Sequence, residues 1–336
     1  MSVDADLTTI WAFIIAFAVF AYVVMDGFDL GIGILFPTLT EGHGRNRAMN
    51  SIAPVWDGNE TWLVMGGGGL MAAFPLAYAV ILPATYPLII AMLLGLVFRG
   101  VAFEFRWRDE RHRPLWDFAF FAGSFVAALT QGMVLGALLQ GIEVEGRAYA
   151  GSWWDWLTPY TLLTGLGVVA GYALLGACWL IWKTEGELQD RVRRLATYAG
   201  IATLVLMAAV SFYNLALFEQ YRERWLTMPN ILFASQVPLL TAIIAYFLFR
   251  GLAKRREAAP FFLALALFLL GMAGLGVSMW PYVVPEALTI WQAAAPERSQ
   301  AFMLVGVAIT LPLILGYTGW AYWVFRGKVG AEGYHD

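Results

Sequence analysis

The chain has 336 residues, of which 60% are hydrophobic and only 13% are charged, and its mean hydropathy is +0.67. Soluble domains carry about 25% charged residues, so this composition excludes a soluble globular protein and indicates a membrane protein. The single cysteine, Cys178, excludes an internal disulfide, a CxxC redox pair and a thiolate metal cluster, and the net charge of −3 favours no class of partner.

The N-terminal segment, residues 1–7, carries Asp4 and Asp6 and no basic side chain after the first residue. A cleavable signal peptide begins with a positively charged region, which this segment lacks. We therefore expect the first apolar run to be retained as a membrane helix.

Nine runs of about 20 mostly apolar residues are long enough to cross a bilayer. In chain order they are residues 8–36, 61–82, 85–105, 116–140, 159–182, 195–218, 228–250, 260–280 and 300–325. The connections between them are too short to hold a soluble domain. The sequence thus predicts one all-α transmembrane domain over residues 1–336, with nine spanning helices.

Basic residues predict the orientation of these spans, because cytoplasmic loops are enriched in Lys and Arg. With nine spans, sixteen basic residues fall on one side, four on the other, and Arg99 lies within a span. The larger group is Arg45, Arg47, Arg106, Arg108, Arg111, Arg113, Lys183, Arg191, Arg193, Arg194, Arg250, Lys254, Arg255, Arg256, Arg326 and Lys328. We expect the N-terminus to be periplasmic and the C-terminus cytoplasmic.

Histidine is the usual ligand of haem iron and of most metals in membrane helices. The chain has three histidines, His43, His112 and His335, and none falls inside a predicted span. No HExxH, CxxCH or glycine-rich phosphate loop is present. The sequence predicts that this chain alone binds neither haem nor a catalytic metal.

Charged side chains gather near the cytoplasmic ends of the first three spans. Asp26 lies about 27 Å along the first helix from Thr8, at roughly 1.5 Å per residue, in the inner third of the bilayer. The set comprises Asp26, Asp29, Asp57, Glu60, Arg99 and Glu104. Close carboxylates can raise one another's proton affinity and pass protons, which favours a functional cluster.

A structural interpretation competes with this functional one. The same side chains could be partly hydrated interface charges, with Arg99 paired to Glu104 or to Asp29. Because arginine does not deprotonate in proteins, we assign Arg99 and Glu104 a structural role as a charge pair. Asp57, Asp26, Asp29 and Glu60 are the candidate proton-carrying residues.

Three stretches resemble subunit II of the cytochrome bd family of quinol oxidases, most closely the shorter form found in cyanide-insensitive oxidases. They are residues 26–31 (DGFDLG), 54–62 (PVWDGNETW) and 98–106 (FRGVAFEFR). The resemblance is strongest over roughly the first 105 residues, and the later helices match mainly in hydropathy and spacing.

The resemblance implies a heterodimer in which subunit I carries haem b, haem d and the quinol site. Subunit II of that family binds no haem and consists of two four-helix bundles plus one peripheral helix. The complex lies in the bacterial inner membrane, oxidises quinol and reduces O₂ to water electrogenically. It takes the protons for this water from the cytoplasm. A small single-helix accessory subunit and a structural quinone or lipid also occur as partners of such complexes.

The resemblance also suggests roles for individual residues. By position, the proton-entrance carboxylate of the family corresponds to Asp57, and its two first-helix acids correspond to Asp26 and Asp29. The tryptophan beside the O₂ path of the family corresponds to Trp62. Subunit II is thus expected to act as a scaffold that supplies part of a proton route and of an O₂ path.

Two other functions are compatible with the residues alone. A stand-alone proton-coupled secondary transporter could use the same acids, although transporters show broken helices at the bilayer midplane, often in two related halves. Here the acids cluster at one edge of the first three spans, without a counterpart in the later ones. A purely structural partner, whose acids only dock subunit I, is the other alternative.

Overall fold

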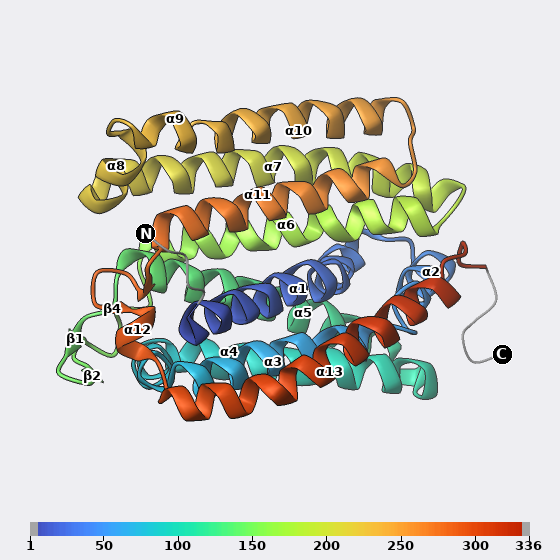
Figure 1. The fold of residues 1–336 in the computed structure, drawn as a ribbon. Helices are drawn as coiled ribbons and strands as arrows, with labels where there is room; N and C mark the ends of the chain where they lie inside the picture. Colours follow the sequence, from blue (N-terminus) through green and yellow to red (C-terminus); the bar gives the residue numbers. More distant parts are fainter. Residues whose placement is uncertain (1–5, 331–336) are drawn as a thin grey trace.

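The computed structural model describes residues 6–330 as a bundle of long helices with two short hairpins at one end (Figure 1). The helices are α1 (Leu7–Leu35), α2 (His43–Asn50), α3 (Trp56–Ala73), α4 (Pro75–Arg108), α5 (Arg113–Gln140), α6 (Pro159–Lys183), α7 (Glu187–Leu217), α8 (Glu219–Leu226), α9 (Asn230–Ala234), α10 (Gln236–Ala253), α11 (Ala259–Met279), α12 (Ile290–Ala293) and α13 (Glu297–Val324). Two 3₁₀ turns, η1 (Phe36–Thr38) and η2 (Glu110–His112), follow α1 and α4.

The hairpins are antiparallel and lie in the two long connections. Strands β1 (Val144–Glu145) and β2 (Ala148–Tyr149) pair between α5 and α6. Strands β3 (Tyr282–Val284) and β4 (Leu288–Thr289) pair between α11 and α12. Both hairpins lie at the left-hand end in Figure 1, opposite α2.

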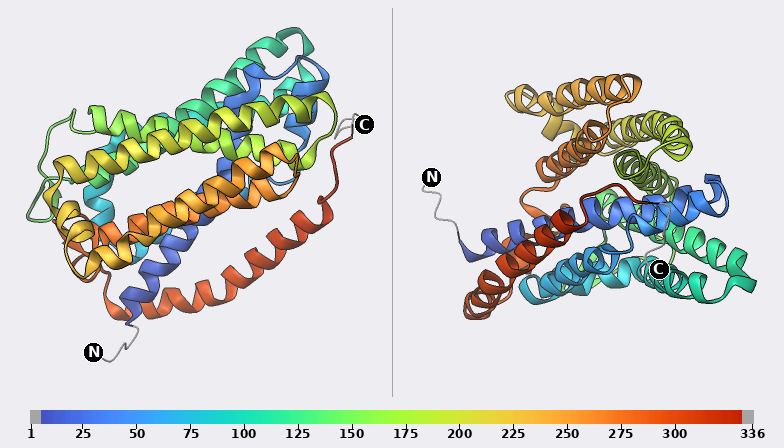
Figure 2. Two further views of the ribbon diagram at one scale, coloured as in Figure 1. Left: turned by 90° about the horizontal axis from the view of Figure 1, so that it is seen from above. Right: turned by 90° about the vertical axis from the view of Figure 1, so that its right-hand side faces the viewer.

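Helix α1 is the centre of the bundle. It contacts α6 and α11 on one side and α3, α5 and α13 on the others. The crossing with α6 is close because Gly31 meets Gly176: a Cβ at Gly31 would lie 1.8 Å from the carbonyl oxygen of Tyr172. Helix α13 lies at the edge of the bundle (Figure 2), and Gln300 is its buried residue.

Eight of the described helical segments are long and apolar enough to cross a membrane. Helix α3 is not among them, because its 18 residues include Asp57 and Glu60 near the N-terminal end. It nevertheless lies beside α1 and α4, in line with the long helices (Figure 1). Its place in the bundle is what brings its polar first turns against α1.

Two predicted helix boundaries are wrong. The break expected near residues 83–84 lies at Phe74, and Pro83 and Pro87 are inside the continuous helix α4. Phe74 precedes Pro75, which disfavours a helical conformation at Phe74 and suits the first position of the next helix. Membrane helices tolerate interior prolines because neighbouring groups satisfy the freed carbonyls.

The other correction concerns a helix start. Helix α7 begins at Glu187, eight residues before the expected start at residue 195, because its polar first turns continue the helix beyond the apolar run. The expected span 228–250 corresponds to the candidate span Asn230–Ala253, in which Ser235 separates α9 from α10. Apolar runs mark what crosses a membrane, and polar turns can extend or interrupt the helix around them.

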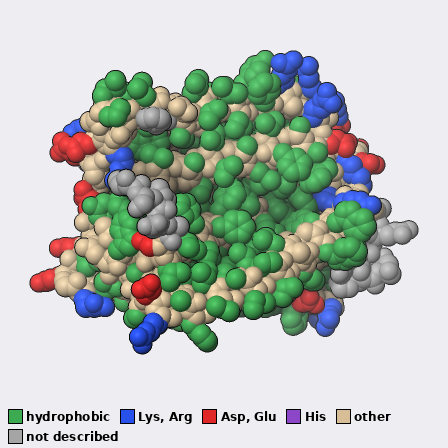
Figure 3. All heavy atoms as spheres, viewed as in Figure 1, with side chains coloured by type: hydrophobic (Ala, Val, Ile, Leu, Met, Phe, Trp, Pro, Cys, Tyr) green, Lys and Arg blue, Asp and Glu red, His purple; other side chains and the backbone are tan. Residues whose placement is uncertain are grey.

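Basic side chains gather at one end of the bundle. In Figure 3 they are concentrated at the right-hand end, where α10 turns into α11. The long helices alternate in direction, so the C-terminal ends of α1, α4, α6, α10 and α13 come together there. The sixteen basic residues of the larger group flank these ends.

Candidate functional site

A buried charge cluster, which we define as Asp26, Asp29, Glu60 and Arg99, lies where α1, α3 and α4 meet. Arg99 Nη1 donates to Asp26 Oδ1 at 2.6 Å, and both side chains are fully buried. Arg99 Nη2 lies 3.2 Å from Glu60 Oε1, whose side chain is 27% exposed. Two carboxylates thus contact one guanidinium, Asp29 follows Asp26 by three residues on α1, and only Glu60 of the cluster opens toward solvent.

Asn59 and Tyr322 extend this cluster to the peripheral helix α13. Asn59 Nδ2 donates to Asp29 Oδ2 at 2.7 Å, and the Tyr322 hydroxyl donates to Asn59 Oδ1 at 2.8 Å. Asn59 is 1% exposed and Asp29 is fully buried. The side chains of α1, α3 and α13 are therefore linked by hydrogen bonds inside the bundle.

Local sequence explains why these side chains meet. Asp26 and Asp29 are three residues apart on α1 and share one face of the helix. A stack of Trp56 on Phe103, with ring centroids 4.9 Å apart, lies beside Arg99, whose guanidinium carbon is 5.7 Å from the Trp56 ring. The stack fixes the start of α3 against α4, and so positions Glu60 next to Arg99.

The crossing of α4 and α5 holds Arg99 in place. A Cβ at Gly95 would lie 2.8 Å from the Gly123 carbonyl oxygen, and a Cβ at Gly123 would lie 2.9 Å from the Arg99 amide nitrogen. Only glycine allows backbones to approach this closely. The Arg99 side chain thus starts beside Gly123 of α5 and reaches Asp26 of α1.

Asp57 is exposed and lies at the mouth of the buried charge cluster. It is in the first turn of α3, three residues before Glu60, so the two carboxylates face the same side of the helix. An exposed carboxylate exchanges protons with bulk water, whereas Asp26 and Asp29 cannot reach it directly. Exposure to solvent thus decreases from Asp57 to Glu60 and then to the two buried acids.

The predicted pairing of Arg99 with Glu104 is wrong. Glu104 is 59% exposed and lies 3.7 Å from Arg108, its ion-pair partner. Five residues along a helix correspond to a rotation of roughly 140°, so Arg99 and Glu104 lie on nearly opposite faces of α4. Arg99 faces the bundle and Glu104 faces outward.

A second hydrogen-bonded chain, not anticipated from the sequence, lies deeper in the bundle. Gln131 of α5 donates to the Tyr22 hydroxyl at 2.7 Å and accepts from the Tyr172 hydroxyl at 2.8 Å. Tyr22 lies one turn before Asp26 on α1, so the chain adjoins the buried charge cluster. A tyrosine inside an apolar run gives little sequence signal, and the interior glutamine was the one available hint.

Comparison with known proteins assigns the chain. The family model described as cytochrome bd terminal oxidase subunit II matches residues 7–325. This chain belongs to the cytochrome bd terminal oxidase subunit II family. It is a subunit of a terminal oxidase, and its apolar helices and bacterial relatives make it a protein of the bacterial cytoplasmic, or inner, membrane.

Relatives and a solved structure agree with the family. The chain is 33% identical to cytochrome bd-I ubiquinol oxidase subunit 2 of Escherichia coli (strain K12), covering 97% of this chain and 96% of that protein. It is 28% identical to cytochrome bd ubiquinol oxidase subunit 2 of Bacillus subtilis (strain 168), covering 97% of each. The structure of bd oxidase from Geobacillus thermodenitrificans matches with a TM-score of 0.76 at 19% identity, covering 95% of this chain and 98% of that chain, and so supports the fold.

Arg106, which ends the third of the three stretches that resemble the cytochrome bd family, belongs to a separate cluster. Its Nε donates to Asp117 Oδ1 at 2.5 Å, and its Nη1 donates to Asn46 at 2.9 Å. Arg45 reaches the other oxygen of Asp117 at 2.8 Å. Arg45 and Arg106 thus share the Asp117 carboxylate, and these bonds hold α2, α4 and α5 together at the basic end of this subunit.

The described histidines lie outside the bundle interior. His43 begins α2, and His112 donates from Nδ1 to the Asp109 carboxylate at 2.9 Å, with its side chain 56% exposed. That hydrogen bond holds the pKa of Asp109 below its ordinary value. His335 lies outside the described residues. In residues 6–330 no group of three His, Cys, Asp or Glu side chains is arranged to hold a metal ion.

Trp62 is almost fully buried, at 1% exposed, two residues after Glu60 on α3. Its ring meets Phe17 edge-on, with centroids 5.7 Å apart, and packs among Ala18, Ala21 and Tyr22 of α1. Its indole nitrogen has no hydrogen-bond partner among the described residues. Trp62 therefore forms an apolar wall beside the buried charge cluster.

Proposed function

We propose that this chain is subunit II of a quinol:oxygen oxidoreductase and that it works beside a subunit I carrying haem b and haem d. The observation that carries the proposal is the family match over residues 7–325. Bound in subunit I, the haems supply the electron transfer and O₂ chemistry, in which quinol is oxidised and O₂ is reduced to water. This chain contributes the scaffold and the side chains through which cytoplasmic protons enter.

The proton route begins at Asp57 and passes through Glu60 to Asp26 and Asp29. Glu60 joins the exposed and the buried parts, since it is partly open and also contacts Arg99. Asp26 and Glu60 contact the same guanidinium, and Asp29 shares a face of α1 with Asp26, so the proposed route passes between neighbouring acids. One oxygen each of Asp26 and Asp29 has no hydrogen-bond partner among the described residues and can carry a proton.

Arg99 fixes the route rather than carrying protons. Its guanidinium stays charged and holds Asp26 and Glu60 at hydrogen-bonding and ion-pair distance. Without a cation, three carboxylates in this position would repel one another inside the bundle.

Trp62 contributes to an O₂ path in this proposal. Its buried ring and small neighbours, Ala18 and Ala21, form an apolar lining on the α1 face of α3. O₂ is apolar and partitions into such surroundings rather than into the charged cluster nearby. Both routes would then run between α1 and α3, with the acids nearer the N-terminal end of α3.

We also propose a single transmembrane domain over residues 1–336 that crosses the membrane nine times. Helix α3 is the ninth crossing: 18 residues rise about 27 Å, close to the roughly 30 Å of a bilayer core. Helices α1 and α3–α5 form one four-helix bundle, α6, α7, α10 and α11 form the second, and α13 is peripheral. The basic end faces the cytoplasm, which places the N-terminus in the periplasm.

Purification of the native complex tests this function against a proton-coupled secondary transporter. The chain is expected to purify with a second polypeptide that carries haem and with quinol oxidase activity. A transporter would purify without haem and would move a solute when reconstituted in vesicles. A small single-helix accessory subunit, or a bound quinone, would be identified by mass spectrometry of the same preparation.

A further inference from the structure

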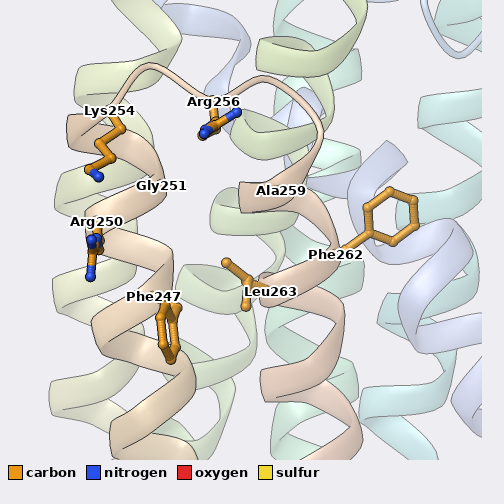
Figure 4. Close-up of a pocket in the computed structure, with 8 residues that line it drawn as sticks. All are labelled: Phe247, Arg250, Gly251, Lys254, Arg256, Ala259, Phe262 and Leu263. Carbon is orange, nitrogen blue, oxygen red and sulfur yellow. The ribbon is translucent and has the colours of Figure 1, made fainter.

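A groove between α10 and α11 lies at the basic end of the bundle, away from the buried charge cluster. It has a volume of about 480 Å³, within the range of ligand sites, and is open to the outside. Figure 4 shows Arg250 and Lys254 one above the other on α10, with Arg256 in the turn that follows. Leu263 of α11 points into the gap between the two helices.

The charges of this groove are not balanced. No carboxylate lines it, and Arg250, Lys254 and Arg256 form no ion pair with any described residue. Within residues 6–330, Arg250 donates a hydrogen bond to the Tyr246 hydroxyl at 3.3 Å, and the Tyr246 ring centroid lies 6.0 Å from its guanidinium carbon. Three cations therefore face one opening without a partner of opposite charge.

A neighbouring groove between α7 and α10 offers a comparison within the same molecule. Its volume is about 420 Å³ and its lining includes Arg193, Arg194 and Arg255. Asp190 also lines it and forms an ion pair with Arg255. The α7–α10 groove thus carries its own counter-charge, whereas the α10–α11 groove does not.

The lower part of the α10–α11 groove is apolar. Phe247 is 47% exposed and lines the groove with Leu263, whereas the Phe262 ring points away from the gap between the helices (Figure 4). Gly251 and Ala259 keep it open, because neither fills the space beside the cations. Cations at the helix ends above exposed apolar side chains match a phosphate headgroup above acyl chains.

We propose that the groove lined by Arg250, Lys254, Arg256, Phe247 and Leu263 binds an anionic phospholipid, with the phosphate on the cations and an acyl chain along the apolar part. Scattered basic residues at helix ends attract lipid headgroups in general. Three cations without an ion-pair partner, around one concave opening that no carboxylate lines, instead favour a lipid that stays bound to the protein. The assignment of this lipid to the cytoplasmic leaflet rests on the proposed orientation, and the site itself does not.

The test uses the complete purified oxidase, delipidated in detergent and titrated with phosphatidylglycerol, with bound lipid counted by native mass spectrometry. The variant Arg250→Gln with Lys254→Gln is expected to weaken one phosphatidylglycerol site at least tenfold. The matched control, Arg111→Gln with Arg326→Gln, removes two exposed charges at the same end and should change binding less than twofold. Equal lipid retention by the variant and the control would overturn the proposal.

A second variant separates shape from charge. Ala259→Trp fills the groove and keeps all three cations, and it should also lose the site. Phosphatidylcholine that binds as well as phosphatidylglycerol, or inorganic phosphate that displaces the lipid, would overturn an anionic-lipid site.

A photoreactive amino acid in place of Leu263 should crosslink lipid, and a crosslink to another polypeptide would show a protein interface instead. Bound lipid is counted without reference to turnover, so a failure of the oxidase proposal leaves this test intact.

Discussion

Arg99 and Asp26 form a fully buried ion pair between α4 and α1, with Nη1 and Oδ1 separated by 2.6 Å across 73 residues of sequence. Buried ion pairs are retained only with good geometry and further hydrogen bonds. Here Glu60 is a second carboxylate partner of the same guanidinium, at 3.2 Å. The pair therefore fixes the relative position of the three helices that carry the proposed proton route.

Replacing Arg99 with leucine should impair assembly of the complex before it alters turnover. The substitution leaves Asp26, Asp29 and Glu60 without a cation, and breaking a buried pair costs about 3–5 kcal/mol. We expect much less assembled oxidase on size-exclusion chromatography, with near-normal turnover per assembled molecule. Arg108→Leu is the control, because its pair with Glu104 is largely exposed and contributes about 0–1 kcal/mol. Full assembly of Arg99→Leu with abolished turnover would contradict the structural role.

Tyr322→Phe should slow proton uptake without preventing assembly. The change removes the hydroxyl that donates to Asn59 and keeps the ring, which meets Phe28 and Trp179 edge-on. One neutral hydrogen bond contributes about 0.5–1.5 kcal/mol, so the melting temperature should fall only slightly. Uptake measured during single-turnover O₂ reduction should fall several-fold, because Asn59 is less firmly held on Asp29. Tyr317→Phe, on the exposed face of the same helix, should have no effect, and equal rates in both variants would sink the idea.

The sequence predicted most of the membrane helices because about 20 apolar residues mark a span with little ambiguity. It misplaced the break between α3 and α4, since the expected spans left a gap at residues 83–84 and the chain instead breaks before Pro75. Which of several prolines ends a helix depends on neighbouring helices, and these are absent from a linear pattern. The polar first turns of α7 were missed because an apolar run shows which residues can lie in lipid. It does not show how far the helix continues beyond them.

The acids of the candidate site were predicted from their positions near one end of three consecutive spans. Their partners were not. Tyr322 lies 263 residues from Asn59, and Gln131 lies 109 residues from Tyr22, so neither contact has a local sequence signature. Pairing of Arg99 with Glu104 followed proximity in sequence, and the rotation of the helix between the two residues makes it wrong.

Reporter fusions test the proposed orientation. A fusion in the turn between α10 and α11, at Lys254 or Glu257, should report a cytoplasmic location. A fusion in the β1–β2 region, at Gly146 or Trp154, should report a periplasmic one. The expectation follows from the sixteen basic residues at one end and the four at the other. The opposite signal from either loop would overturn the orientation.

Attachment of residues 325–330, which follow α13, to the rest of the bundle should depend on pH through Glu257. Hydrogen bonds from Lys328 and Gln189 hold the pKa of the Glu257 carboxyl below its ordinary value. A lowered folded-state pKa means that the stabilisation is complete above the unfolded value of about 4.3 and is lost as the pH falls through the folded value. The Val329 amide, which donates to the Lys183 carbonyl at 2.9 Å, reports this attachment.

Hydrogen–deuterium exchange at Val329, corrected for the intrinsic rate at each pH, measures the effect. Wild-type protection should decrease below about pH 4, and Glu257→Gln should reduce protection at every pH. Glu187→Gln is the control, because Glu187 is exposed and forms no ion pair with a described residue. Unchanged protection of Val329 in Glu257→Gln at neutral pH would show that this carboxylate does not hold the segment.

Asp57→Asn should leave the complex assembled and slow its proton uptake. Asp57 is exposed at the start of α3 and lies three residues before Glu60, the half-buried acid that contacts Arg99. Asparagine keeps the size and hydrogen bonding of the side chain and removes its titration. Because no described hydrogen bond of the buried charge cluster involves Asp57, haem content and subunit stoichiometry should stay at wild-type levels.

Uptake during single-turnover O₂ reduction by Asp57→Asn should be at least tenfold slower, a barrier increase of about 1.4 kcal/mol or more. Glu41→Gln removes another exposed carboxylate at the same end and should keep the wild-type rate. If Asp57 serves only to dock subunit I, Asp57→Asn would instead lose haem or dissociate, with normal turnover in the surviving fraction. Full assembly with a wild-type uptake rate would show that protons enter elsewhere, and Glu60, the only partly open member of the buried charge cluster, would then be the first residue that bulk water can protonate.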